Sequence, residues 1–547
     1  MRMRFFLPNP IKTLIAATSS PPSSFRLLSS LRSCRFDSAL TRNHTTLRSP
    51  IGRRMTSIAA SVNNESGLAR RFWIKFTRES VFAMYTPFVI ALASGNLHID
   101  SFRHYIAQDV HFLRAFAQAS VSISLSFFLR NLVKRELKLS RAMTPCMRLY
   151  AFLGNKFQEL LDSDESTHPY KKWIDNYASD GFQASALQTE DLLDKLSVSL
   201  TGEELDVIEK LYYQAMKLEI DFFSAQPLFQ PTILPLTKGH NPTKDHLVIF
   251  SDFDLTCTVV DSSAILAEIA IVTAPKSDQN QTEDQMVRLS SSDLRNTWGF
   301  LSKQYTEEYE QCIELIMPAN KLDNFDYKEL STALEQLSKF ENTANNRVIE
   351  SGVLKGINLE DIKRAGERLI LQDGCSNFFQ RIVKNENLNA KVHVLSYCWC
   401  GDLIRSAFSS ADLKELDIHA NEFTYEGSVS SGEILKKVES PIDKVQAFRN
   451  ILKNSNDDKK KLTVYIGDSV GDLLCLLEAD IGIVIGSSSS LRSVGAQFGV
   501  TFVPLFSGLV KKQKEYNEES CSNWKGLSGI LYTVSSWAEV HAFILGC

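Results

Sequence analysis

The sequence predicts two domains: an all-α helical bundle, then an α/β domain with a doubly wound parallel sheet and an inserted helical cap. First, residues 68–226 carry apolar side chains at a period of about 3.6, with few glycines or prolines. Second, short apolar runs alternate with helical patterns after residue 245. Third, a chain of 547 residues is too long to fold around a single hydrophobic core, so more than one domain is expected.

The first element, residues 1–60, has the composition of a disordered organellar targeting peptide. Residues 1–54 hold nine Arg and one Lys against a single acid, Asp37, and they are rich in Ser and Thr. Such a leader predicts a mitochondrial address, with a plastid as the alternative. Initiation at Met55 would delete the leader and give a cytosolic form. A disordered tail without an address is the competing interpretation.

Within the bundle, residues 68–226, polar groups interrupt apolar helix faces. Asp109 lies inside the apolar stripe of one predicted helix, and Glu219 lies on the apolar face of another. Cys146 and Tyr150 are four residues apart, hence neighbours on one helix surface. A buried carboxylate is costly unless it is paired or functional, so these residues indicate a polar pocket in the bundle core. The alternatives are a thiol that only fills the core and acids that are salt-bridged or half-exposed.

Residues 227–244 are the predicted linker, because Pro and Gly are concentrated there. The second domain, residues 245–547, then begins with an apolar run typical of a buried strand. Five such runs are predicted as strands of the sheet, at 246–250, 391–395, 462–466, 481–485 and 501–503.

Acidic residues follow two of these strands. Asp252 and Asp254 are two residues apart on an extended segment, so both can face one point beyond the first strand. Asp468 and Asp472 follow the strand at 462–466. Ligands bind at the carboxyl edge of such sheets, and an oxygen-lined site there suits Mg²⁺. We expect all four aspartates to hold Mg²⁺; the alternative is that they only cap loops.

The same residues predict phosphoryl transfer. A carboxylate such as Asp252 can attack phosphorus, and the resulting acyl phosphate is easily hydrolysed. Asp254 would protonate the leaving alcohol and later deprotonate water. Lys444 and Ser396 can hold the phosphate oxygens, since the anion needs cations and donors beside it.

The segment between these motifs, about 260–368, reads as an inserted helical cap. A covering cap excludes water and favours a small-molecule substrate. The net charge of −4 argues against a nucleic-acid partner. No apolar run of about eighteen residues is present, so no transmembrane helix is expected.

The order of these motifs resembles that of the haloacid dehalogenase superfamily. The resemblance spans about residues 245–505. It rests on D-x-D-x-T at Asp252, a Ser after a second strand, a Lys, and G-D-S-x-G-D at 467–472. It implies the roles given above: Asp252 as nucleophile, Asp254 as acid/base, Ser396 and Lys444 as phosphate ligands, and Asp468 with Asp472 at the metal.

The helical half resembles the TenA family over about residues 68–226. The resemblance rests on the segments 105–109, 145–150, 168–177 and 218–222. It implies hydrolysis of an amino group from an aminomethylpyrimidine, with Cys146 as nucleophile and Glu219 as proton donor. Asp109, Tyr150 and Tyr177 would bind the pyrimidine. Phe112 departs from the family, where Tyr is common.

The fusion of these two halves resembles plant bifunctional proteins of thiamin metabolism. It implies hydrolysis of thiamin monophosphate by the second half and salvage of aminopyrimidines by the first. One alternative keeps the phosphatase and makes the helical half a thiamin- or pyrimidine-binding module. Another is a phosphatase for a different small phosphate ester. TenA relatives also imply a homo-oligomer formed through the helical domain.

Overall fold

The computed structural model describes residues 67–126, 133–161, 167–275, 288–454, 459–516 and 524–547. Side chains are described throughout these ranges except at 112, 113, 115–126 and 133–142. The predicted leader, with Met55, and the side chain of Phe112 therefore lie outside the described residues. None of the described helices combines the length and the apolar character that crossing a bilayer requires.

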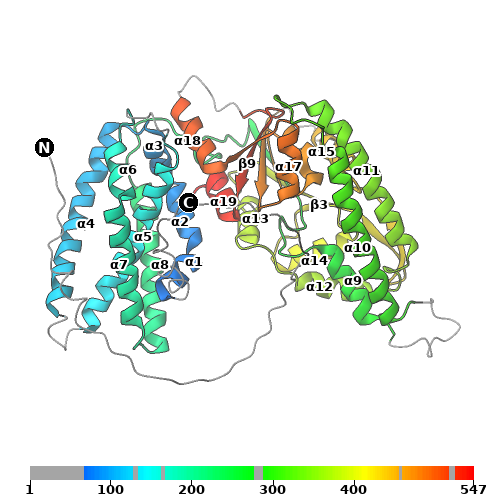
Figure 1. The fold of residues 1–547 in the computed structure, drawn as a ribbon, viewed down its shortest axis with the longest axis horizontal. Coiled ribbons are helices and arrows are strands. Elements are labelled where there is room, and N and C mark those ends of the chain that lie inside the picture. The colour runs from blue at the N-terminus through cyan, green and yellow to red at the C-terminus, as the bar shows by residue number, and fades with distance from the viewer. Residues whose placement is uncertain (1–66, 127–132, 162–166, 276–287, 455–458, 517–523) are drawn as a thin grey trace, which may run out of the picture. The chain divides into compact units, whose positions relative to one another are not determined.

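The helical half contains helices α1–α8 (Figure 1). The helix α5 is central, because α6, α7 and α8 all pack against it. The longest helices, α4, α5 and α8, carry the residues that the sequence singles out. The bounds are α1 Leu68–Lys75, α2 Thr77–Met84, α3 Pro87–Ser94, α4 Ile99–Ser126, α5 Val133–Gln158, α6 Lys171–Ala178, α7 Asp180–Ser197 and α8 Gly202–Ser224.

Local signals in the sequence explain where these helices begin and end. The helix α8 begins with a capping box, in which the side chains of Thr201 and Glu204 each accept from the other's backbone N–H. The helix α3 begins at Pro87 after the cap Thr86, and it ends at Gly95 with φ of 78°, a conformation that favours glycine.

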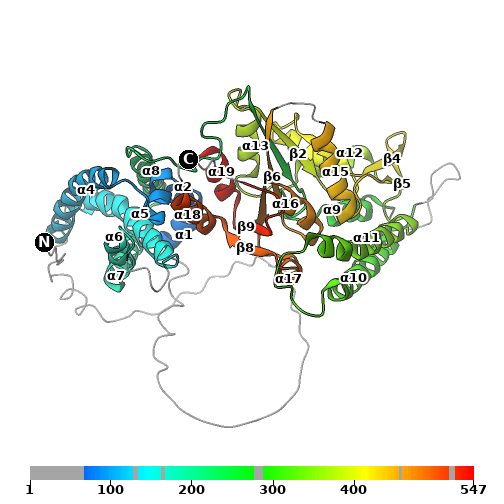
Figure 2. The same ribbon diagram turned by 90° about the horizontal axis from the view of Figure 1, so that it is seen from above.

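The second half is built on a seven-stranded parallel sheet with the order β3-β2-β1-β6-β7-β9-β8. In Figure 2 the strands lie between helices, with α13 and α19 on one side and α15 and α16 on the other. Their bounds are β1 Asp245–Ser251, β2 Ala390–Leu395, β3 Asp417–His419, β6 Lys460–Gly467, β7 Ile481–Ile485, β8 Thr501–Pro504 and β9 Ile530–Val534. All five predicted strands are confirmed. Four further strands are not among those predicted: β3, β9 and the antiparallel hairpin of β4, Glu422–Glu426, and β5, Val429–Leu435.

The register of β1 and β6 positions the site. Ser251 pairs with Ile466, and the N–H of Asp252 donates to the Ile466 carbonyl at 2.9 Å. The two strands therefore end side by side, and the loops that follow them share one edge of the sheet. The helices of the sheet half, outside the cap, are α13 Cys375–Val383, α14 Gly401–Ser410, α15 Pro441–Asn454, η4 Val470–Asp472, α16 Leu473–Glu478, α17 Ser489–Gln497, α18 Leu505–Glu515 and α19 Trp537–Leu545.

The insertion between β1 and β2 is helical, as the sequence predicts. It holds α9 Ser262–Thr273, α10 Ser291–Ile316, α11 Tyr327–Glu350 and α12 Leu359–Glu367. The long helices α10 and α11 lie side by side in both views (Figures 1 and 2). They stand over the carboxyl edge of the sheet, because both helices line the same cavity as Asp252.

Candidate active sites

The loop after β1 carries the first two aspartates. Its backbone turns sharply at Leu255, whose φ of 58° is unusual for a branched side chain. The Leu255 N–H donates to the Thr258 hydroxyl at 3.0 Å, which helps to hold this conformation. Such strain is typical of functional loops, and here it turns the chain back after Asp254.

Three aspartates from the two neighbouring loops gather at the sheet edge. Asp252, Asp468 and Asp472 each place one carboxylate oxygen within 4.8 Å of those of the other two. The Thr256 hydroxyl donates to Asp468 at 2.9 Å. Burial and the charge of Asp472 raise the pKa of Asp468 to about 7, a repulsion that a divalent cation would relieve. Oxygen-only ligands with excess negative charge fit Mg²⁺.

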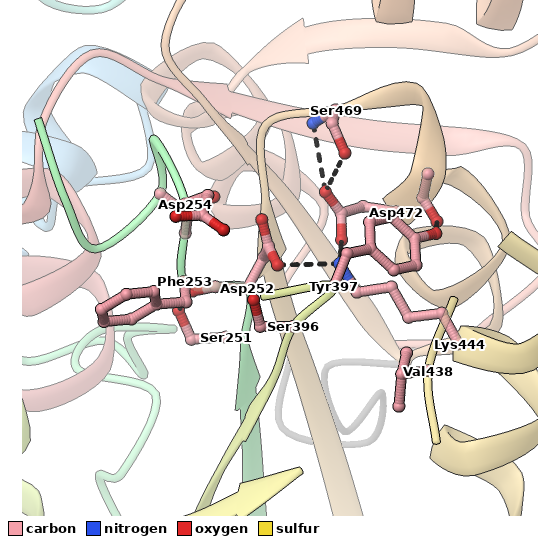
Figure 3. Close-up of polar contacts among 12 residues, drawn as sticks. Ser251, Asp252, Phe253, Asp254, Ser396, Tyr397, Val438, Lys444, Ser469 and Asp472 are labelled. Carbon is pink, nitrogen blue, oxygen red and sulfur yellow. Dashed lines mark hydrogen bonds and ion pairs between the residues drawn. The ribbon is translucent and has the colours of Figure 1, made fainter. Parts of the chain in front are cut away.

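Lys444 of α15 lies between two of these acids, as Figure 3 shows. Its Nζ is 2.8 Å from Asp252 Oδ1 and 2.7 Å from Asp472 Oδ1, and the side chain is fully buried. Burial would lower the pKa of Lys444, but the two carboxylates outweigh burial and raise it. Lys444 is therefore a fixed positive charge beside the oxygen that is predicted to attack phosphorus.

Asp254 does not join the group of three. Its carboxylate accepts hydrogen bonds from the Ser262 N–H at 2.7 Å and from the Ser262 hydroxyl at 2.8 Å. Burial raises the pKa of Asp254 to about 7, where the group can both give and take a proton near neutrality. The geometry thus suits the predicted acid/base role, whereas the expected metal ligation by its side chain has no support among the described residues.

Ser396 follows β2, as predicted, and is buried at the same sheet edge. Its hydroxyl oxygen accepts from the Cys398 N–H at 3.0 Å, which leaves the hydroxyl hydrogen for a phosphate oxygen. Tyr397 is not among the predicted site residues. The centre of its ring lies 4.2 Å from Lys444 Nζ, and its hydroxyl donates to the Gly471 carbonyl. No spacing rule marks this tyrosine, because its partners come from other segments.

A cavity of about 370 Å³ opens above these groups. The catalytic loops form its floor and the cap helices α10 and α11 form its walls. This is the size range of small-molecule sites. The predicted small substrate is compatible with this enclosure.

The helical half holds a second cluster of the predicted residues. The Cys146 thiol of α5 hydrogen-bonds the Glu219 carboxylate of α8, which also accepts from the Tyr150 hydroxyl. Burial raises the pKa of Glu219 to about 7. Burial, together with the charge of Glu219, raises the pKa of Cys146 well above its usual range. The thiol is thus protonated at neutral pH, with a proton acceptor already in contact.

Asp109 of α4 completes this cluster, since its charge acts on Cys146 and Glu219. Burial raises the pKa of Asp109 to about 6. The rings of Tyr150 and Tyr177 have centroids 4.9 Å apart. Tyr105 is not among the predicted site residues, although its hydroxyl donates to that of Tyr150 and accepts from the Trp173 indole, both at 3.3 Å. Tyr105 is buried, so a motif alone could not separate it from the core.

Fold and sites together define a two-part hydrolase: a helical half with a Cys–Glu site and an α/β half with an aspartate site beside a lysine. A family model for the TENA/THI-4/PQQC family matches residues 81–127 and 133–227. The chain is 60% identical to the "Bifunctional TH2 protein, mitochondrial" of Arabidopsis thaliana, covering 90% of this chain and 91% of that relative. The chain therefore belongs to the bifunctional TH2 protein family and is a bifunctional enzyme of thiamin metabolism. Its predicted mitochondrial location is confirmed by the same relative.

Two further similarities cover part of the chain. A CTO1 family protein of Schizosaccharomyces pombe is 25% identical over 54% of this chain and 98% of its own length. A solved structure of a substrate-bound phosphoserine phosphatase complex is 18% identical, with a TM-score of 0.29, over 45% of this chain and 89% of its own.

Proposed function

We propose that the α/β half hydrolyses thiamin monophosphate to thiamin and phosphate through an aspartyl phosphate on Asp252. The observation that carries this proposal is the grouping of Asp252, Asp468 and Asp472 around one point, with Lys444 in direct contact with two of them. The choice of substrate rests on membership of the TH2 family and on the enclosed cavity.

Mg²⁺ is the proposed metal, with Asp252, Asp468 and Asp472 as its carboxylate ligands. When bound, it neutralises charge on the phosphoryl oxygens and so lets a carboxylate approach them. Lys444 contributes a second positive charge at the same place, and its burial keeps it fixed. Ser396 donates to a phosphoryl oxygen from the neighbouring strand.

In the proposed reaction, an Asp252 oxygen bonds to phosphorus as the bond from phosphorus to the ester oxygen breaks. Asp254 gives its proton to the departing alcohol, and its pKa of about 7 makes this possible near neutral pH. The same carboxylate, now ionised, takes a proton from water that attacks the acyl phosphate. Phosphate then leaves and Asp252 is regenerated.

A substrate panel tests the proposal against its rival, a phosphatase for another small ester. Thiamin monophosphate should give the highest kcat/KM among sugar, amino-acid and aromatic phosphate esters, and Asp252→Asn should abolish turnover of all of them. The isostere cannot attack phosphorus. A sugar or amino-acid phosphate hydrolysed better than thiamin monophosphate would favour the rival.

We further propose that the helical half removes the amino group of aminomethylpyrimidines. Cys146 would attack the ring carbon that bears the amine, and Glu219, which contacts the thiol, would accept its proton and pass it to the departing amine as the C–N bond breaks. Water would then add to the same ring carbon, the C–S bond would break, and the thiol would be restored. Asp109, Tyr150 and Tyr177 would hold the pyrimidine.

The rival for this half is a binding module without chemistry. Cys146→Ala should abolish ammonia release while leaving pyrimidine binding measurable by calorimetry. Glu219→Gln should do the same. Binding without ammonia release by the unmodified protein, across several aminopyrimidines, would favour the module.

A further inference from the structure

The cap walls of the phosphatase cavity are aromatic. On α10, Trp298, Tyr305 and Tyr309 recur at helical spacing and line the cavity. The rings of Tyr305 and Tyr309 stack with centroids 5.8 Å apart. Trp399, after β2, meets Trp298 edge to face at 6.3 Å and 88°. These flat faces fit a flat partner.

The orientation of these rings is fixed by polar contacts. The Trp399 indole N–H donates to Asn345 Oδ1 of α11 at 3.0 Å. The Tyr305 hydroxyl donates to Glu341 Oε1 of α11 at 2.9 Å. The two cap helices are thereby tied to each other and to the β2 loop at the cavity.

Two acids of the cap line the cavity, Asp261 and Glu341, and neither has a basic partner among the described ion pairs. Asp261 caps α9 by accepting from the Ser263 N–H at 2.8 Å, whereas Glu341 accepts from Tyr305 of the aromatic wall. Two other charges that line the cavity are paired: Arg347 with Glu308 at 2.5 Å, and Glu439 with Lys436 at 2.9 Å. Besides burial, the charges of Glu341 and Asp252 both raise the pKa of the Tyr397 phenol. Glu341 of the cap is therefore close enough to the catalytic aspartates to act on a neighbour that they share.

We infer that Glu341 and the aromatic rings around it select a phosphate ester whose alcohol part carries a flat aromatic cation. The inference rests on the proposed phosphatase function and names the residue that determines its specificity. A cation over aromatic faces is attracted by their negative quadrupoles, and a carboxylate beside it adds direct charge pairing.

The physical state of Glu341 without a ligand agrees with this role. Burial raises its pKa to about 7, although the Tyr305 hydrogen bond opposes the shift. A cation bound beside it would favour the ionised form, so the carboxylate gains its partner when the substrate binds. Tyr305 is then a positioning residue, which holds the carboxylate toward the rings.

The test compares two substrates that differ in one charge: thiamin monophosphate and its isostere with the cationic ring nitrogen replaced by carbon. Glu341→Gln keeps the acceptor for Tyr305 and removes the charge. We expect kcat/KM for the cationic ester to fall about tenfold or more, through KM, while that for the neutral ester changes less than about twofold. The matched control is Glu335→Gln, on the exposed face of the same helix.

Equal effects of Glu341→Gln on the two esters, or no effect on either, would overturn the inference. Retained selectivity for the cationic ester in the variant would do the same. Failure of the proposed phosphatase function looks different, because Asp252→Asn would then leave both esters turning over.

Discussion

Buried acids with raised pKa values mark both sites at the scale of single residues. Motif spacing in the sequence singled out the acids for which we propose binding or reacting roles: Asp252, Asp254, Asp468, Glu219 and Asp109. The residues that orient buried acids were missed, because no motif spacing marks the hydrogen-bond donors that the cap helices supply. The Ser262 contact with Asp254 and the Tyr305 contact with Glu341 show this, since a cap helix supplies each partner.

The raised pKa of Glu219 predicts a pH-dependent stability. In the folded protein Glu219 keeps its proton up to its pKa of about 7, whereas in the unfolded chain a glutamate loses the proton near pH 4.5. The folded state thus binds more protons in this window, so this group makes the free energy of unfolding fall as pH rises from about 4.5 to 7. The Glu219→Gln variant should lack this fall in the free energy of unfolding. At pH 8 the variant should therefore be more stable than the unmodified protein.

Urea denaturation at pH 4.5 and 8, with circular dichroism at both, measures the effect. The control is Asp221→Asn, an exposed acid two residues along the same helix. A stability difference between Glu219→Gln and the unmodified protein that is equal at the two pH values would contradict the account.

At the scale of elements, two glycines allow the loop after β6, which carries Asp468 and Asp472, to pack closely against neighbouring side chains. A Cβ on Gly471 would lie 2.5 Å from the Tyr397 ring, and one on Gly467 would lie 2.6 Å from Asp472 Cγ. The motif at 467–472 therefore needs glycine for packing as well as acids for chemistry.

We predict that Gly471→Ala displaces Tyr397 or the loop that carries Asp468 and Asp472. Phosphatase kcat/KM should fall at least about tenfold, because an ångström of misplacement costs up to about a hundredfold in rate. Gly299→Ala is the control, since a Cβ there meets nothing within 4 Å. Steady-state kinetics would decide, and unchanged activity in Gly471→Ala would contradict the packing argument.

The strands show how far pattern alone carries the fold. Runs such as 481–485 are apolar on both faces and were predicted with their bounds. The strand β3 has three residues of intermediate burial, too short and too polar for a pattern. The strand β9 is apolar, so its residues are of the kind that a pattern can identify as a strand. Its place between β7 and β8 is different, because the order of strands in the sequence does not determine which strands pair.

At the scale of the whole molecule, we predict that the two activities are separable. Removal of divalent ions with EDTA should abolish phosphate release and leave ammonia release unchanged, because the chemistry proposed for Cys146 and Glu219 calls for no metal ion. Cys146→Ala should have the reverse effect. Parallel assays of the full chain would test this, and loss of both activities under EDTA would contradict it.

The central claim is that Asp252 accepts the phosphoryl group. The most direct measurement is to quench the enzyme during turnover of thiamin monophosphate with Mg²⁺, reduce acyl phosphates with borohydride, and locate the resulting homoserine by peptide mass spectrometry. The account predicts homoserine at position 252, absent without Mg²⁺ or in Asp252→Asn. Homoserine at another aspartate, or none while phosphate is released in a burst, would contradict it.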